Sequence, residues 1–275
     1  MPTSMIVAAL LAFAPAQTPV AAPAGKLEIT NVRNTYGVLG PTRTNSKLLP
    51  GDILFVSYDI DGISVDDDGR VHYSMVMEVI DKDGKATLKQ DPFEKIELVP
   101  LGGNRVAARA FVTLGVDHPA GEFTMKVTVT DRADKNKASQ TLERKFEVLA
   151  PDFGIVAVYG SLDERGQTAA PTTGVVGQAI FINYTAVGFK RDADKKQPNL
   201  HFEMVTLDEN SKPLMKKPLF HDGIDLDEKL PNYTVRFLLP MTRPGKFTIR
   251  LSCTDTVTKK TASVDLPVLI LAGEK

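Results

Sequence analysis

One alternating stretch occurs twice in this chain of 275 residues. Residues 121–131 read GEFTMKVTVTD and residues 245–255 read GKFTIRLSCTD. The two copies continue without a gap to positions 139 and 263, and eight of the 19 aligned residues are identical. Apolar and polar residues alternate in both copies, as they do in a β-strand with one buried face and one solvated face. The repeat therefore predicts two copies of one β domain.

Other landmarks return in the same order later in the chain. The matched pairs are Gly51–Tyr58 with Gly177–Tyr184, Tyr73 with Leu200, Met75 with Phe202, and Met77 with Met204. Turn signals such as Asp83-Gly84 separate short alternating segments, and no segment has a helical period. We therefore predict an all-β fold of two tandem antiparallel β-sandwich domains related by internal duplication. The predicted domains span residues 26–149 and 150–272, with a Pro-containing boundary at Leu149–Asp152.

The alternation and the turn signals also predict local structure. Ala86–Lys89 and Ile96–Val99 are predicted to be two separate short strands. Tyr36–Pro50 and Ser161–Gly174 are rich in turn-forming and polar residues, so both are predicted to be loops.

The first 24 residues have the features of an export signal. The apolar run Met5–Phe13 is shorter than the roughly 20 residues that a membrane span needs. Small residues at Ala14–Ala16 and Ala22–Ala24 fit a cleavage site, although no Lys or Arg precedes the run. We predict a signal peptide or leader at 1–24 and a secreted or periplasmic protein. We expect no membrane span, because no later segment is apolar enough.

Charge and cysteine content narrow the possible classes. The chain has 33 basic and 34 acidic residues, whereas a nucleic-acid binder would show a basic excess, so we expect no nucleic-acid partner. The single cysteine, Cys253, cannot form a disulfide within the chain. Cys253 matches Val129 in the other copy, which predicts a small buried apolar side chain.

The sequence contains no motif for catalysis, a cofactor or a metal, so we predict no catalytic, cofactor-binding or metal-ligating residues and no cofactor. Of the four histidines, His72 and His201 both lie near the start of the third predicted strand of their domain, and we interpret them as scaffold or surface residues. Tyr58 and Tyr184 match and are predicted to pack in the cores. The two remaining histidines are His118 and His221.

Two acidic groups keep a calcium site open as an alternative. Their members are Asp59, Asp61, Asp66, Asp67 and Asp68 in the first group, and Asp222, Asp225, Asp227 and Glu228 in the second. Calcium prefers several oxygen ligands at once, but the spacing of an EF-hand is absent. Aspartates in turns are commonly turn formers, and we interpret these residues in that way.

The landmarks over residues 26–272 resemble the immunoglobulin-like and fibronectin-III-like group of sandwiches, although the marker cysteine pair and the tryptophan of antibody-type domains are missing. The turns at Leu49–Asp52, Asp81–Gly84, Leu101–Arg105 and Pro119–Phe123 also resemble those of exported bacterial proteins of unassigned function. The resemblance implies an Ig-like fold and secretion, and it implies no activity.

We therefore expect an exported non-enzymatic protein that acts as a structural, adhesion or protein-binding module in the cell envelope or outside the cell. Its expected partner is another protein. Two alternatives stay open: a periplasmic chaperone or assembly factor, because pilus chaperones also have two Ig-like domains, and a hydrolase or glycan-active accessory protein. The identity of the partner and the oligomeric state stay open too.

Overall fold

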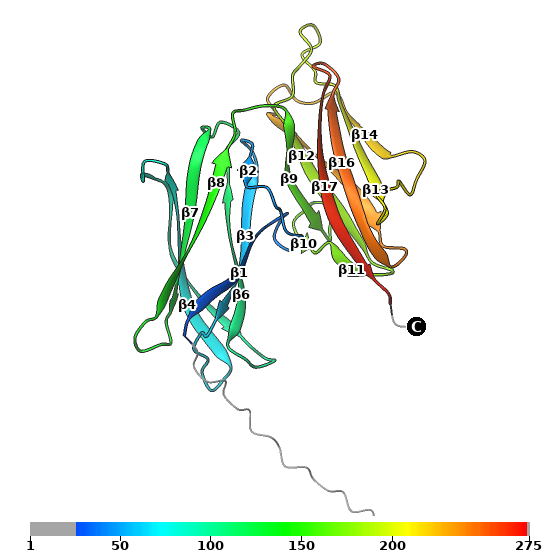
Figure 1. The fold of residues 1–275 in the computed structure, drawn as a ribbon. Coiled ribbons are helices and arrows are strands. Elements are labelled where there is room, and N and C mark those ends of the chain that lie inside the picture. The colour runs from blue at the N-terminus through cyan, green and yellow to red at the C-terminus, as the bar shows by residue number, and fades with distance from the viewer. Residues whose placement is uncertain (1–25, 274–275) are drawn as a thin grey trace, which may run out of the picture.

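The computed structural model describes residues 26–273, and the predicted leader at 1–24 lies outside them. The described residues form strands, turns and loops without a helix, which confirms the all-β prediction. None of this range is a helix of membrane-spanning length and hydrophobicity. Buried hydrophobic residues form two clusters, one from Leu27 to Val148 and the other from Phe153 to Ile270. Figure 1 shows the two sandwiches side by side, while the domain limits stay a prediction.

The first half, residues 26–149, has one sheet of three strands and one of five. Its strands are β1 (Glu28–Thr35), β2 (Lys47–Leu48), β3 (Ile53–Asp61), β4 (Arg70–Asp81), β5 (Ala86–Leu98), β6 (Arg105–Thr113), β7 (Gly121–Asp131) and β8 (Ser139–Val148). The strand orders are β1-β3-β6 and β2-β8-β7-β4-β5. All pairs are antiparallel except the short pair β2 and β8, which is parallel.

The second half, residues 150–272, repeats this arrangement. Its strands are β9 (Gly154–Ser161), β10 (Ala169–Ala170), β11 (Thr173–Val175), β12 (Ala179–Val187), β13 (Leu200–Leu207), β14 (Leu219–Gly223), β15 (Asn232–Pro240), β16 (Gly245–Asp255) and β17 (Lys260–Leu271). The orders are β10-β9-β12-β15 and β11-β17-β16-β13-β14, and again one short pair, β11 and β17, is parallel. Two antiparallel sheets around an apolar core are consistent with the Ig-like sandwich that the resemblance implied.

The repeated stretch forms an interior strand of the larger sheet in each half, β7 and β16. Its alternate apolar side chains are buried as predicted: Phe123, Met125, Val127 and Val129 on β7, and Phe247, Ile249, Leu251 and Cys253 on β16. Burial of a large apolar side chain stabilises a fold by about 1.5–3 kcal/mol. The apolar positions of the repeat are therefore core residues that stabilise each sandwich.

Strand β5 corrects one prediction. The two short strands expected at Ala86–Lys89 and Ile96–Val99 are parts of a single strand of 13 residues. Asp91 and Pro92 both lie opposite Val76 of β4, so the proline sits in a β-bulge. Since β5 is an edge strand, a residue without an N–H group does not remove a bond from the middle of the sheet.

Both predicted loops contain short strands. Lys47–Leu48 lies within the loop expected at Tyr36–Pro50. In the loop expected at Ser161–Gly174, β10 lies inside the range and β11 crosses its end. These expectations were wrong at those residues, because strands of two or three residues are too short to show an alternating pattern.

A second bulge occurs at the same place in both halves. On β1, Asn31 and Val32 lie opposite Tyr58, and Asn31 has a φ of 50°. On β9, Ala157 and Val158 lie opposite Tyr184, and Ala157 has a φ of 48°. Asparagine tolerates this left-handed conformation better than alanine does. The shared bulge supports the duplication at a position where the residue types differ.

The bulge on β9 also holds the two halves together. The backbone N–H of Ala157 donates a hydrogen bond of 3.0 Å to Asp52 Oδ1 in the first half. The other oxygen of this buried carboxylate lies 2.8 Å from Arg43 Nη2. Tyr36, in the loop after β1, packs against the second core. The N–H group at the bulge of the second half thus donates to a carboxylate that is ion-paired in the first half.

Candidate protein-binding grooves

His72 on β4 and His201 on β13 each contact a carboxylate on the neighbouring edge strand. His72 Nε2 lies 3.0 Å from Glu94 Oε2, and Arg132 Nη2 lies 2.9 Å from Glu94 Oε1. The bond with His72, followed by the charge of Arg132, lowers the pKa of Glu94. His201 Nδ1 lies 2.6 Å from Asp222 Oδ1. Both histidines are half-exposed, in agreement with the surface interpretation.

The other two histidines lie apart from these contacts. His118 Nδ1 is 3.0 Å from the carbonyl oxygen of Pro119, and His221 Nε2 is 2.9 Å from the hydroxyl of Tyr233. Within residues 26–273, no three His, Cys, Asp or Glu side chains are grouped so that they could hold a metal ion. That the chain has no metal ligands stays a prediction.

Several carboxylates of the acidic groups have separate partners. Asp59 accepts a hydrogen bond of 2.7 Å from Asn31 Nδ2. Arg105 and Thr30 both donate to Asp61, and the bond from Arg105 is the main cause of its lowered pKa. The remaining contacts cap turns: Asp66 accepts from the N–H groups of Asp68 and Arg70, and Asp227 from that of Lys229. These contacts are those of turn formers and cross-strand pairs.

Cys253 is fully buried, as predicted. It lies between Phe202 on β13 and Ala262 on β17 in the sheet register. Burial, with a smaller effect of the charge of Asp255, raises the pKa of its thiol to about 12. A thiol in this state is a packing group and a poor nucleophile.

The matched tyrosines are core residues, also as predicted. Tyr58 and Tyr184 are 1% and 0% exposed. The Tyr58 hydroxyl donates to Met75 Sδ at 3.0 Å, while the Tyr184 hydroxyl donates to the carbonyl oxygens of Glu203 at 3.0 Å and Ser252 at 3.2 Å. Burial raises the pKa of both phenols, so both hydroxyls stay protonated as donors.

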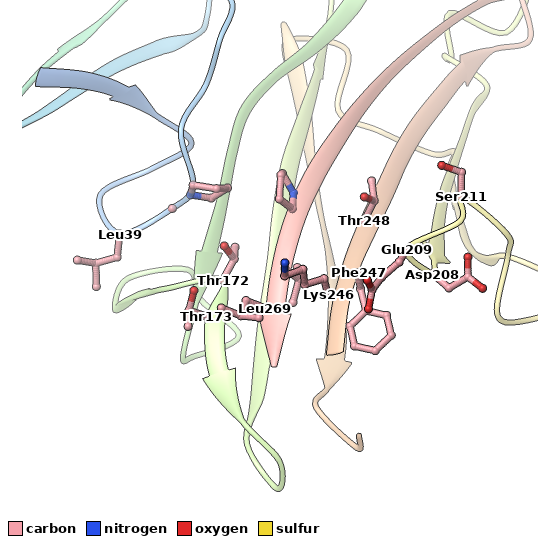
Figure 2. Close-up of a pocket in the computed structure, with 14 residues that line it drawn as sticks. Leu39, Thr172, Thr173, Asp208, Glu209, Ser211, Lys246, Phe247, Thr248 and Leu269 are labelled. Carbon is pink, nitrogen blue, oxygen red and sulfur yellow. The ribbon is translucent and has the colours of Figure 1, made fainter. Parts of the chain in front are cut away.

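A pocket of about 420 Å³ lies on the outer face of the larger sheet of the second half (Figure 2). Lys246 and Leu269 come from β16 and β17, and Leu39 approaches from a loop of the first half. Asp208 and Glu209 lie on the opposite side of Lys246 from Leu39 in this view. The lining thus mixes both charges with apolar surface, and a pocket of about 520 Å³ lined by Asp81, Glu122 and Phe123 occupies the matched place in the first half.

Two other cavities occupy matched places in the two sandwiches. The first groove, of about 480 Å³, lies between β5 and β6, where the two sheets of the first half diverge. Met75 and Met77 of β4 form its floor. Leu88 and Phe93 of β5, both 40% exposed, line one side, and Ala110 of β6 lines the other. An apolar surface is therefore open to solvent along the side of the sandwich.

The second groove, of about 310 Å³, lies between β14 and β15. Its floor contains Met204, the counterpart of Met77, and Leu238 and Leu239 of β15 line one side. Leu214 and Met215, from the connection between β13 and β14, line the other and are 40% and 51% exposed. No sequence motif pointed to either groove.

The strands that border the grooves are the edges of their sheets. An edge strand presents unpaired N–H and C=O groups that can pair with another chain. On β5 the bulge at Asp91 and Pro92 interrupts this row. Strand β6 has neither proline nor bulge, and it pairs with β3 in unbroken register from Arg105 to Thr113. The free edge of β6 is therefore the better template for an added strand.

The charged residues that line the two grooves are all basic: Lys89 and Arg109 in the first, and Arg243 in the second. Lys89 pairs with Glu78 at 3.1 Å. Arg109, in contrast, makes no salt bridge with any residue from 26 to 273. In a chain whose total charge is balanced, the charged residues beside both apolar grooves are thus basic.

No protein-family model matches this chain, and no curated protein matches it in sequence. The C-terminal domain of the Streptococcus pyogenes antigen I/II-family protein AspA is 8% identical over 89% of this chain and 100% of that chain, with a TM-score of 0.30. The C-terminal domain of the Streptococcus agalactiae AgI/II polypeptide BspA is 9% identical over 88% of this chain and 100% of that chain, with a TM-score of 0.29. Red sea bream transglutaminase is 11% identical over 91% of this chain, which spans only 32% of that chain, with a TM-score of 0.29. Similarities of this size assign neither a family nor a function.

Proposed function

We propose that this chain is a non-enzymatic protein-binding module that takes up an extended segment of a partner protein at the open side of a sandwich. One observation supports the proposal: an apolar groove borders an edge strand at the matched place in both halves. Addition of a strand to such an edge uses backbone hydrogen bonds for affinity and side-chain pockets for specificity.

We also propose that the module works in the cell envelope or outside the cell, as a structural or adhesion protein. The support is the predicted leader, with its apolar run at Met5–Phe13 and the small residues that follow. Mass spectrometry of the N-terminus of the protein recovered from cells should find a chain that begins near residue 17 or residue 25. An uncleaved chain in the cytosol would contradict export.

Binding of defined peptides tests the proposed function. A fluorescent peptide of about nine residues, Thr-Val-Thr-Phe-Asp-Val-Thr-Val-Thr, alternates apolar and polar side chains as an added strand would. We expect saturable binding in fluorescence anisotropy. The matched control has the same sequence with N-methyl groups on alternate amides, in both possible phases, so that one phase cannot pair with the edge.

The two outcomes differ clearly. Loss of binding in one N-methylated phase and its retention in the other would support strand addition, because alternate N–H groups point to opposite edges of the added strand and only one edge pairs with the protein. Failure of every peptide to bind, or equal binding of both phases and of the unmodified peptide, would contradict it.

A further inference from the structure

We infer that the first groove is the one that receives the partner strand, and that it selects a large apolar side chain followed by a carboxylate. This inference rests on the proposed function and names the chemistry of the partner segment. It commits to one occupant, an extended segment of another protein with that pattern.

The space for a large side chain comes from small residues on β6. Register places Ala108 opposite Tyr58 and Val235 opposite Tyr184, so Ala110 and Phe237 are counterparts. In the second half, the Phe237 ring stacks on Tyr184 with centroids 6.0 Å apart. Alanine at the matched position leaves this part of the first sandwich open, and Ala110 lines the groove. A side chain from a partner can occupy the space beside Ala110 that corresponds to the position of the Phe237 ring in the second half.

In the second half, two side chains bridge the strands β14 and β15 that border the groove. The rings of His221 on β14 and Tyr233 on β15 stack with centroids 5.9 Å apart, and the hydrogen bond of 2.9 Å joins them. The matched residues in the first half are Phe93 and Val106, and Phe93 is 40% exposed. The first groove therefore keeps its edge strand β6 free where β15 is partly covered.

The floor of the first groove suits side chains of varied shape. Met75 and Met77 are 6% and 8% exposed and lie side by side on β4 beneath the opening. Methionine is unbranched and polarizable, so it adapts to an inserted ring or branched chain. In the second half a phenylalanine, Phe202, replaces Met75, and its stiffer ring already packs on Tyr184 at 5.7 Å.

The charge of the groove selects the neighbouring residue. Arg109 precedes Ala110 on β6, lines the groove and lacks an ion pair within the described range. A strand added to β6 places one of its own outward side chains opposite Arg109, because residues that face each other across two strands lie on one face. A carboxylate at that position pairs with the arginine on the outer face of the sheet, directly beside the side chain that enters the groove.

Three peptides and four proteins test the inference. The peptides are the Phe-Asp sequence above, a version with Ala for Phe, and a version with Asn for Asp. The proteins are the wild type, Ala110→Phe, Arg109→Gln and the matched control Ala107→Phe. Ala107 lies on the same strand but is exposed on its outer face, so the control adds the same ring without filling the groove.

We expect the Ala version of the peptide to bind at least about tenfold more weakly than the Phe version, since a large apolar side chain is lost from a buried site. Ala110→Phe should weaken the Phe peptide by a similar factor, and Ala107→Phe by less than about twofold. The Asn peptide and Arg109→Gln should each lose up to about fivefold, and together no more than either alone, because they remove the same pair.

Cross-linking gives a readout that needs no variant of the protein to fold. A peptide with benzoylphenylalanine in place of Phe should label Met75 or Met77, as mass spectrometry of the digested complex would show. If no peptide binds the wild type, the proposed function itself fails. If peptides bind but Ala110→Phe and Ala107→Phe act alike, or the label falls on Met204 or another surface, the function stands and this inference is overturned.

Discussion

At the scale of single residues, duplication provides its own controls. Tyr58 and Tyr184 occupy matched buried positions, but their hydroxyl groups have different partners. Sulfur is a weak acceptor, whereas Tyr184 donates to backbone carbonyl oxygens on two strands. Replacement of each tyrosine by phenylalanine keeps the ring and removes only the hydroxyl. The two variants therefore show how much the hydrogen bonds contribute to stability apart from the ring.

We predict that Tyr184→Phe lowers the free energy of unfolding by about 1–2 kcal/mol, because it removes well-formed buried hydrogen bonds. Tyr58→Phe should cost less than about 0.5 kcal/mol, since it removes only the contact with the sulfur of Met75. Urea unfolding of both variants measures the difference. Equal losses would show that the hydroxyl groups contribute alike and would contradict this assignment.

Some residue-level predictions could be made from sequence and others could not. The alternation around Cys253 was enough to predict its burial, because position within a strand decides which face a side chain occupies. The contact of His201 with Asp222 was not predictable, since it depends on β14, a strand of only five residues. The role of Ala110 needed the register of β6 against β3, which no local pattern contains.

At the scale of elements, an ion pair joins two strands on the outer face of the second half. Arg250 of β16 donates to both oxygens of Asp265 on β17, at 2.8 Å each. These hydrogen bonds, and to a smaller extent the charge of Arg250, lower the pKa of Asp265. Both side chains are about half exposed, so solvent screens the pair.

The lowered pKa gives a prediction for acid stability. The folded protein binds fewer protons at Asp265 than the unfolded chain does, so the contribution of the pair is present above about pH 4 and is lost as the pH falls through the folded pKa. The wild type should lose free energy of unfolding between pH 5 and pH 3, and Asp265→Asn should lose less. We expect the two losses to differ by less than about 1 kcal/mol. Urea unfolding across that range measures it, and a steeper loss in the variant would contradict the sign.

The repeated strand ends on an aspartate in both copies, and each aspartate makes the same kind of contact. Asp131 accepts hydrogen bonds from the N–H groups of Ser64 and Ala133, at 2.7 and 3.0 Å. Asp255 accepts in the same way from Lys190 and Val257, at 3.0 Å each. Each buried carboxylate ties the hairpin that follows its strand to a distant loop. The sequence contained the residues of this tie, but its partners are visible only in the fold.

At the scale of the whole molecule, the joint between the halves depends on a buried ion pair. Asp52 is 2% exposed and accepts from both Arg43 and the N–H of Ala157. The bulge that frees this N–H was not predictable, because alanine has no preference for a positive φ. The sequence predicted two sandwiches, whereas their contact depends on this unusual backbone.

We predict that Asp52→Ala lowers the free energy of unfolding by about 3–5 kcal/mol, because it leaves the charge of Arg43 buried without its partner. The double variant Arg43→Met with Asp52→Ala should be more stable than Asp52→Ala alone, since the unpaired charge is gone. Chemical unfolding compares the two. If the single variant were the more stable, the ion pair would not be what holds the joint.

The proposed binding of a partner depends on the free edge of β6 as the place where its strand adds. Amide hydrogen exchange of the full chain, with and without saturating Thr-Val-Thr-Phe-Asp-Val-Thr-Val-Thr peptide, tests it most directly. We predict that exchange slows at amides within Arg105–Thr113 and stays unchanged at Asn232–Pro240. Unchanged exchange along β6 with the peptide bound, or slower exchange only at β15 or at the pocket of Figure 2, would contradict the account.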